Sequence, residues 1–254
     1  MKPRLCMLSA LLAVVLVSGM AWGYPTRFGA ATGLVDLPTA DVAMSGGAEL
    51  AGDYTRLENG QQIWPVRLLI GASAGAEVGF VYAKLKDGIN DNATGFGAKM
   101  ALMEEPTADY GVGVGASFLN LPDVDMLNIY AVLTKEFTVA APQARRSEAP
   151  RPRVRGHLGV MFTRITDGAD DDEVQPFLGV DITSPEGTSF VVEYKPTKFG
   201  DDYAAAAIRY PLSPKVTAQV GVARSGTVLG QDDYRFFVGF NYNFAVTDEE
   251  GAVY

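Results

Sequence analysis

The stretch RFFVGFNYNF, residues 235–244, alternates between two kinds of side chain. One face of an extended chain would carry only large apolar residues: Phe236, Val238, Phe240, Tyr242 and Phe244. The other face would be mixed: Arg235, Phe237, Gly239, Asn241 and Asn243. A period of two residues predicts a β-strand whose faces meet different surroundings. A tilted strand of about ten residues also matches the hydrocarbon core of a membrane, whereas soluble sandwiches use strands of about five to six.

The same alternation recurs from residue 47 onward, and no segment there has helical periodicity. Residues 110–118, for example, place glycines on one face and apolar side chains on the other. Pro65 lies inside the second predicted strand, where it favours an edge strand or a bulge because proline cannot donate to a ladder. We therefore predict an all-β fold, an antiparallel up-and-down transmembrane β-barrel of about 12 strands over residues 46–244.

The predicted connections differ between the two ends of this barrel. At one end they are mostly longer and rich in Asp, Asn and Gly: 56–61, 86–92, 120–125, 167–173, 196–202 and 225–233. At the other end three are tight turns: 73–75, 184–187 and 212–215. This asymmetry is typical of transmembrane barrels. The segment 138–153, rich in Pro and Arg, breaks the pattern, and we interpret it as a periplasmic excursion.

Residues 1–23 are typical of a secretory signal peptide. Lys2 and Arg4 precede an apolar run, and small residues allow cleavage before Tyr24. The chain has 254 residues, one Cys and a formal charge of −9; cleavage would leave 254 − 23 = 231 residues, no Cys and a charge of −9 − 2 = −11. This acidic balance argues against a nucleic-acid partner. Residues 245–254 would form an acidic C-terminal tail.

If the apolar faces contact lipid, the opposite faces line the lumen. These inward faces carry six acids and five bases: Glu49, Asp53, Arg67, Glu77, Lys99, Glu136, Arg155, Asp181, Glu193, Arg209 and Arg235. Because unpaired charges inside a narrow barrel would be costly, the near balance favours a structural network of salt bridges. The alternative is a selectivity filter, which would favour one sign of charge.

Several inward positions are glycines and leave space along one wall: Gly95, Gly97, Gly111, Gly113 and Gly115. Two occupants fit this space. Water would make the barrel a channel, whereas the segment 24–45 would make it a plugged barrel. The sequence leaves both alternatives open.

The sequence gives weak support to an enzyme. His157 is the only His, and no partner can be assigned to it by spacing, so a hydrogen-bonded lumen residue is the simpler interpretation. The Gly-x-Gly pairs lie inside strands with no following helix, so they are not phosphate loops. The acidic stretch 167–173 lacks the spacing of a calcium loop. We predict no catalytic residue, metal site or cofactor; a barrel hydrolase using His157 is the alternative.

Two stretches resemble a known family. Residues 29–42, GAATGLVDLPTADV, resemble the N-terminal signature of the YjbH-like outer-membrane proteins. Residues 188–195, TSFVVEYK, followed by the return 203–210, resemble that family's repeated strand with a lumen glutamate, here Glu193. The resemblance implies a Gram-negative outer-membrane barrel, in a family often associated with exopolysaccharide or capsule production.

These features predict an outer-membrane β-barrel of the cell envelope, exopolysaccharide-associated or porin-like, acting as a passive channel or a structural barrel. We expect it to reach the outer membrane by secretion through its signal peptide. The expected partners are outer-membrane lipid and lipopolysaccharide, the barrel-insertion machinery and a polysaccharide. The alternative from another class is a soluble periplasmic β-barrel that binds an apolar ligand.

Overall fold

The computed structural model describes residues 26, 30–43, 45–58, 60–72, 75–86, 91–104, 108–122, 124–137, 152–166, 170–197, 202–225 and 233–245. The predicted signal peptide and most of the 138–153 segment and of the 245–254 tail lie outside these residues. The strands are β1 (Gly47–Leu57), β2 (Gln62–Ala72), β3 (Ala76–Lys86), β4 (Asn92–Met103), β5 (Gly111–Leu121), β6 (Val124–Phe137), β7 (Arg153–Thr166), β8 (Asp170–Thr183), β9 (Ser189–Lys195), β10 (Tyr203–Ser213), β11 (Val216–Ser225) and β12 (Asp233–Ala245).

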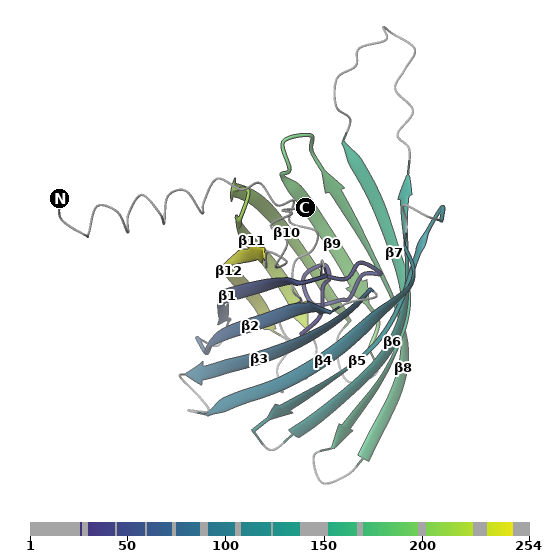
Figure 1. Ribbon diagram of the computed structural model, residues 1–254. Coiled ribbons are helices and arrows are strands. Elements are labelled where there is room, and N and C mark those ends of the chain that lie inside the picture. Colours follow the sequence, from purple (N-terminus) through teal and green to yellow (C-terminus); the bar gives the residue numbers. More distant parts are fainter. Residues whose placement is uncertain are drawn as a thin grey trace, which may run out of the picture.

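These strands form one closed antiparallel barrel, in which each strand pairs with its neighbours in sequence and β1 closes the ring on β12 (Figure 1). The closing ladder runs from the Gly47–Ala245 pair to the Leu57–Arg235 pair. Closure satisfies the backbone groups that an open sheet would leave at its edges. The predicted all-β, up-and-down barrel of 12 strands is thus confirmed. Among the described residues, no helix is long and apolar enough to cross a membrane.

We call the two ends of the barrel proximal and distal. The N-terminal residues pass into β1 at the proximal end, which also carries the connections that follow the even-numbered strands. The connections that follow the odd-numbered strands lie at the distal end.

The two faces of the wall differ as the alternation predicts. On β12, Phe236 is 67% exposed on the outside while Phe237 is 2% exposed in the lumen. The outward faces of the other strands are likewise apolar, with Phe80, Phe96 and Leu158 each more than half exposed. A soluble protein rarely exposes a continuous apolar surface of this size, whereas a lipid-facing barrel requires one.

Three sequence expectations need correction. The connections are not longer at the distal end: only two residues separate β5 from β6 there, whereas at the proximal end seven residues separate β4 from β5. The acidic stretch expected as part of a loop, 167–173, belongs to β8 from Asp170 onward, and Arg164 of β7 stabilises this extension by an ion pair with Asp172 (2.7 Å). Pro65 lies in a wall strand of a closed barrel; the β1–β2 ladder instead stops at Gly52 and resumes at Thr55.

Candidate functional site: the barrel lumen

The lumen contains a segment of the chain itself. Residues 30–43, which we call the inner segment, lie within the ring of strands and are drawn in purple in Figure 1. The segment forms a small hairpin: Gly33 bridges Pro38, and Leu34 N–H donates to the Leu37 carbonyl (2.9 Å). Most of its side chains are fully buried, among them Leu34 and Val35. In this conformation, part of the N-terminal region rather than water therefore occupies the space inside the barrel.

Glu193 of β9 holds the tip of the hairpin. Its carboxylate accepts the backbone N–H groups of Val35 (2.9 Å), Asp36 (2.7 Å) and Leu37 (3.1 Å). The Tyr203 hydroxyl, at the start of β10, donates to the same carboxylate. Three successive N–H groups converging on one anion form a backbone nest, which is a favourable site for negative charge. Glu193 is thus bound from the inner segment on one side and from the wall on the other.

A second carboxylate holds the base of the hairpin. Glu77 of β3 accepts the N–H groups of Thr32 (2.7 Å) and Ala43 (2.6 Å), and it pairs with Lys99 of β4 (Nζ–Oε1 3.1 Å). The Lys99 ammonium also donates to the carbonyls of Thr32 (2.8 Å) and Thr39 (3.2 Å). Both ionic side chains are fully buried, so the backbone of the inner segment supplies hydrogen bonds that a buried ion pair needs.

Two arginines also bind the inner segment. Arg209 of β10 donates to the carbonyls of Gly33 (3.3 Å) and Leu34. Arg155 of β7 pairs with Asp41 of the segment (3.0 Å) and with Asp181 on the wall (3.1 Å). The wall thus binds the segment through side chains of both signs, with acids on N–H groups and bases on carbonyl or carboxylate oxygens.

His157 belongs to the same set of contacts. Its Nε2 lies 2.8 Å from Asp181 and its Nδ1 lies 2.8 Å from the Thr134 hydroxyl oxygen. That oxygen in turn accepts the N–H of Ala40 in the inner segment (3.0 Å). Both ring nitrogens therefore have partners, and this buried chain of hydrogen bonds connects β8, β7 and β6 to the segment.

Apolar packing surrounds these polar contacts. Leu34, Val35 and Leu37 of the inner segment join one cluster with inward side chains of the wall such as Phe177 and Phe237. A second cluster, reached by Ala30, lies toward the distal end and includes the inward side chains of β1–β5: Leu57, Ile63, Val81, Ala83, Leu85, Ala93, Leu119 and Leu121. The lumen therefore resembles a small hydrophobic core more closely than a water-filled channel.

Glycines in the wall make room for the inner segment. A Cβ at Gly79 would collide with the carbonyl of Ala30, and one at Gly179 would collide with the Leu34 side chain. A Cβ at Gly113 would lie 3.1 Å from the Cα of Ala40. Two other predicted gaps are filled differently: the Tyr130 ring occupies the space beside Gly115, and Val81 and Leu119 occupy the space beside Gly95. Gly111 lines the cavity at the proximal end.

The remaining predicted lumen charges lie along the wall and at its proximal rim. Asp53 pairs with Arg67, both fully buried, and Gln219 donates to Asp53 (3.0 Å). Asn241 donates to Glu49 (3.3 Å). Arg235 is buried in the lumen-facing row of β12, and Glu136 lies at the exposed proximal rim, paired with Arg153 (2.7 Å). Of the eleven predicted residues, five thus bind the inner segment: Glu77, Lys99, Arg155, Glu193 and Arg209.

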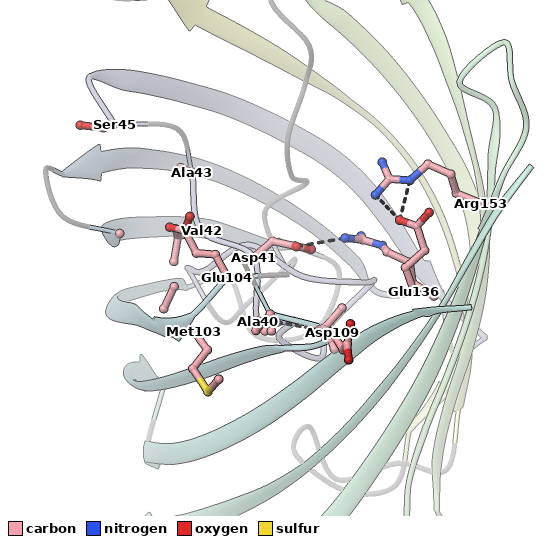
Figure 2. A pocket seen from close by; sticks show the side chains of 16 residues that line it. Ala40, Asp41, Val42, Ala43, Ser45, Met103, Glu104, Asp109, Glu136 and Arg153 are labelled. Carbon is pink, nitrogen blue, oxygen red and sulfur yellow. Dashed lines mark hydrogen bonds and ion pairs between the residues drawn. The ribbon is translucent and has the colours of Figure 1, made fainter. Parts of the chain in front are cut away.

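At the proximal end a cavity of about 670 Å³ opens beside the inner segment. Its lining includes Asp41 of the segment and Glu104, Asp109, Glu136 and Arg153 of the barrel. Figure 2 shows the Glu136–Arg153 pair on the wall and Asp41 reaching a guanidinium across the cavity. No group of three or more potential metal ligands was found among the described residues.

Sequence reasoning missed Thr134 and Tyr203, which complete the contacts of His157 and Glu193. Both occupy inward positions of their strands, so the alternation could have placed them in the lumen. Their hydrogen bonds depend on the position of the inner segment, for which the sequence contains no periodic signal. The same holds for Asp41, whose partner Arg155 lies 114 residues away.

The closed antiparallel ring with an apolar outer surface is the fold of porin-like β-barrels. The structure of KdgM porin has this fold: the TM-score is 0.55 with 11% sequence identity, over 77% of this chain and 99% of that chain. KdgM porin in complex with disordered oligogalacturonate gives a TM-score of 0.54 at 11% identity. NanC porin gives 0.52 at 11% identity, over 77% of this chain and 98% of that chain. No family model and no curated protein sequence matches the chain.

Proposed function

We propose that this protein is an outer-membrane, porin-like barrel that its own inner segment holds closed. The observation that carries the proposal is the binding of the segment's backbone N–H groups by two buried wall carboxylates, Glu193 and Glu77. Side chains at two separate places on the wall thus bind the same segment. An open passive channel would have no need of such contacts.

The membrane location rests on the outward surface. Large apolar side chains are exposed on every strand except β5, where the outward row carries less exposed residues such as Val114. A bilayer would cover this surface; the soluble alternative would leave it in water. Both ends of the barrel sequence, Gly47 and Ala245, lie at the proximal end. Insertion from the periplasm would leave that end on the periplasmic side and the distal end outside.

The contacts also suggest how the barrel opens. Removing the inner segment would uncover Glu77, Lys99, Glu193 and Arg209, whose charges would then face water along the wall. Over the part of the lumen that the inner segment occupies, a passage lined in this way suits a polar solute. Opening therefore requires that the bound N–H and carbonyl groups of the segment exchange their partners for water, which makes the closed state the resting state.

An acidic oligosaccharide is the solute class with the most support. The resemblance to the YjbH-like family implies an exopolysaccharide association, and a KdgM structure was solved with oligogalacturonate. Liposome swelling with neutral and uronic-acid oligosaccharides of equal length would test this class. The liposomes would carry a variant in which the inner segment is released, such as Glu193→Gln. We expect the acidic sugars to enter faster than the neutral ones; equal rates would contradict the proposal.

A catalytic role for His157 has no support in the geometry, because both of its nitrogens are hydrogen-bonded beneath the inner segment. The membrane assignment is tested by fractionation of the native protein. We expect recovery in the outer-membrane fraction and extraction only by detergent. A monodisperse mature protein obtained without detergent would contradict the assignment and favour the soluble alternative.

A further inference from the structure

One rim of the barrel carries a one-sided arrangement of charge on its outer face. Five adjacent strands, in the order β11, β12, β1, β2 and β3, have four exposed bases at their distal ends: Arg224, Arg56, Lys84 and Lys86. The described outward positions of these five strands include no acid. We call these four residues the basic rim.

The register places an aromatic ring next to each part of the basic rim. Arg224 lies opposite Tyr234 with its guanidinium 5.9 Å from the ring centroid. Arg56 lies opposite Phe236. Lys84 lies opposite Trp64, and the ammonium of Lys86 lies 6.0 Å from the same indole ring. Bases and aromatic rings therefore form one continuous band across five strands.

The depth of this band matches the membrane interface. One step closer to the middle of the barrel, the outward side chains are apolar, as at Val66, Val222 and Val238. Aromatic side chains such as Trp64 mark the level of lipid headgroups. At the proximal ends of the same strands the outward residues are uncharged: Ala48, Ala72, Ala76, Val216 and Phe244. The positive charge is confined to the distal rim.

The two central bases of the band are Arg56 of β1 and Lys84 of β3. Among the described residues, neither Arg56 nor Lys84 forms an ion pair, and the described acids closest in sequence, Glu58 and Asp91, lie in connections beyond the strand ends. Elsewhere on the same rim the outward-facing Arg164 is paired with Asp172 at 2.7 Å. Arg56 and Lys84 thus differ from Arg164 in having positive charge available to a partner.

We propose that the basic rim binds the phosphate groups of a phosphorylated glycolipid in the leaflet at the distal end. Ammonium and guanidinium groups bind phosphate by charge-assisted hydrogen bonds, and sugar rings stack against aromatic faces. The acyl chains of such a lipid would lie against the apolar side chains below the band, including Val66 and Phe80. This inference rests on the proposed membrane location and adds a specific lipid class to it.

The test compares lipid binding by two double variants in detergent, read by native mass spectrometry with bisphosphorylated lipid A as the probe. Arg56→Gln with Lys84→Gln removes two charges from the basic rim. The control, Lys135→Gln with Arg164→Gln, removes two exposed outward charges from other parts of the barrel. Each base near the membrane surface raises the affinity for an anionic lipid by about tenfold or slightly less. The first variant should therefore need at least tenfold more lipid A for half occupancy. The control should stay within about twofold of the unsubstituted protein.

Two results would overturn the inference. One is an equal shift in both double variants; the other is equal binding of lipid A from which both phosphates have been removed. Insertion into phosphatidylethanolamine vesicles is measured in parallel. Failure to insert would contradict the proposed membrane function itself, whereas normal insertion with unchanged lipid A binding would contradict only the role of the basic rim.

Discussion

Replacing Glu193 by Gln should release the inner segment. One carboxylate oxygen accepts from the N–H groups of Val35 and Leu37, and the other from Asp36 N–H and the Tyr203 hydroxyl. An amide keeps one acceptor oxygen and turns the other position into a donor, so one pair of donors loses its acceptor. An unsatisfied buried donor costs about 1–3 kcal/mol, and lost charge assistance weakens the remaining bonds. The total is about 2–4 kcal/mol, or roughly a 30- to 1000-fold shift toward the open state.

Single-channel recording in planar bilayers measures this shift. Glu193→Gln should increase the fraction of time that the barrel spends in a conducting state. The conductance of each single opening should stay unchanged. Glu49→Gln is the matched control, because Glu49 is also a buried wall carboxylate but is bound by Asn241 of β12. If both variants open no more often than the unsubstituted protein, the contacts of Glu193 do not hold the barrel closed.

Three further predictions concern packing, insertion and the buried histidine. Gly179→Val should also raise the open fraction, since a Cβ there collides with Leu34; bilayer recordings that match the unsubstituted protein would contradict this. Phe240→Lys should reduce folding into vesicles by about 2–4 kcal/mol, because the side chain faces outward in the middle of β12; unchanged urea titrations would be the contrary result. His157→Leu should destabilise the folded barrel by about 1–3 kcal/mol by removing the buried hydrogen bonds of the ring to Thr134 and Asp181, visible as a lower urea midpoint.

The wall of the barrel could be predicted from sequence because each strand lies between two constant environments. Lipid on one side and the lumen on the other impose the period of two that separates Phe236 from Phe237. The positions of the inward charges follow from the same alternation. This is why Glu77, Lys99 and Glu193 could be placed on inward faces without knowledge of their partners.

The partners could not be predicted, because they belong to a segment without regular structure. Glu193 contacts Val35 across 158 residues of sequence, and the contact uses the backbone N–H, which every residue except proline possesses. The apolar cluster at the distal end was missed for a related reason. An inward Leu57 or Leu85 does not alter the alternation, but it fills the lumen where a water-filled channel would have polar side chains.

Loop lengths were the least predictable feature. Asp, Asn and Gly are typical of loops, yet strand pairing continues through Asp172, where Arg164 compensates the charge. Similarly, Asn120 and Asp125 pair with each other across a two-residue turn, joined by a side-chain hydrogen bond of 2.6 Å. A local partner across the ladder thus decides whether such residues extend a strand or end it.

The presence of the inner segment in the lumen can be measured directly by disulfide cross-linking in isolated outer membranes. The Cα of Ala40 lies 3.1 Å from the position of a Cβ at Gly113, so a cysteine there requires the segment to shift by only a few tenths of an ångström, unlike the collision at Gly179. Cysteines at positions 40 and 113 would then lie close enough for a bridge. We predict near-complete cross-linking of Ala40→Cys with Gly113→Cys under mild oxidation. The pair Ala40→Cys with Val114→Cys should not cross-link, because residue 114 faces the opposite side of the wall. Absence of the 40–113 bridge, together with rapid labelling of Cys at position 40 by a water-soluble maleimide, would show that the segment lies outside the lumen.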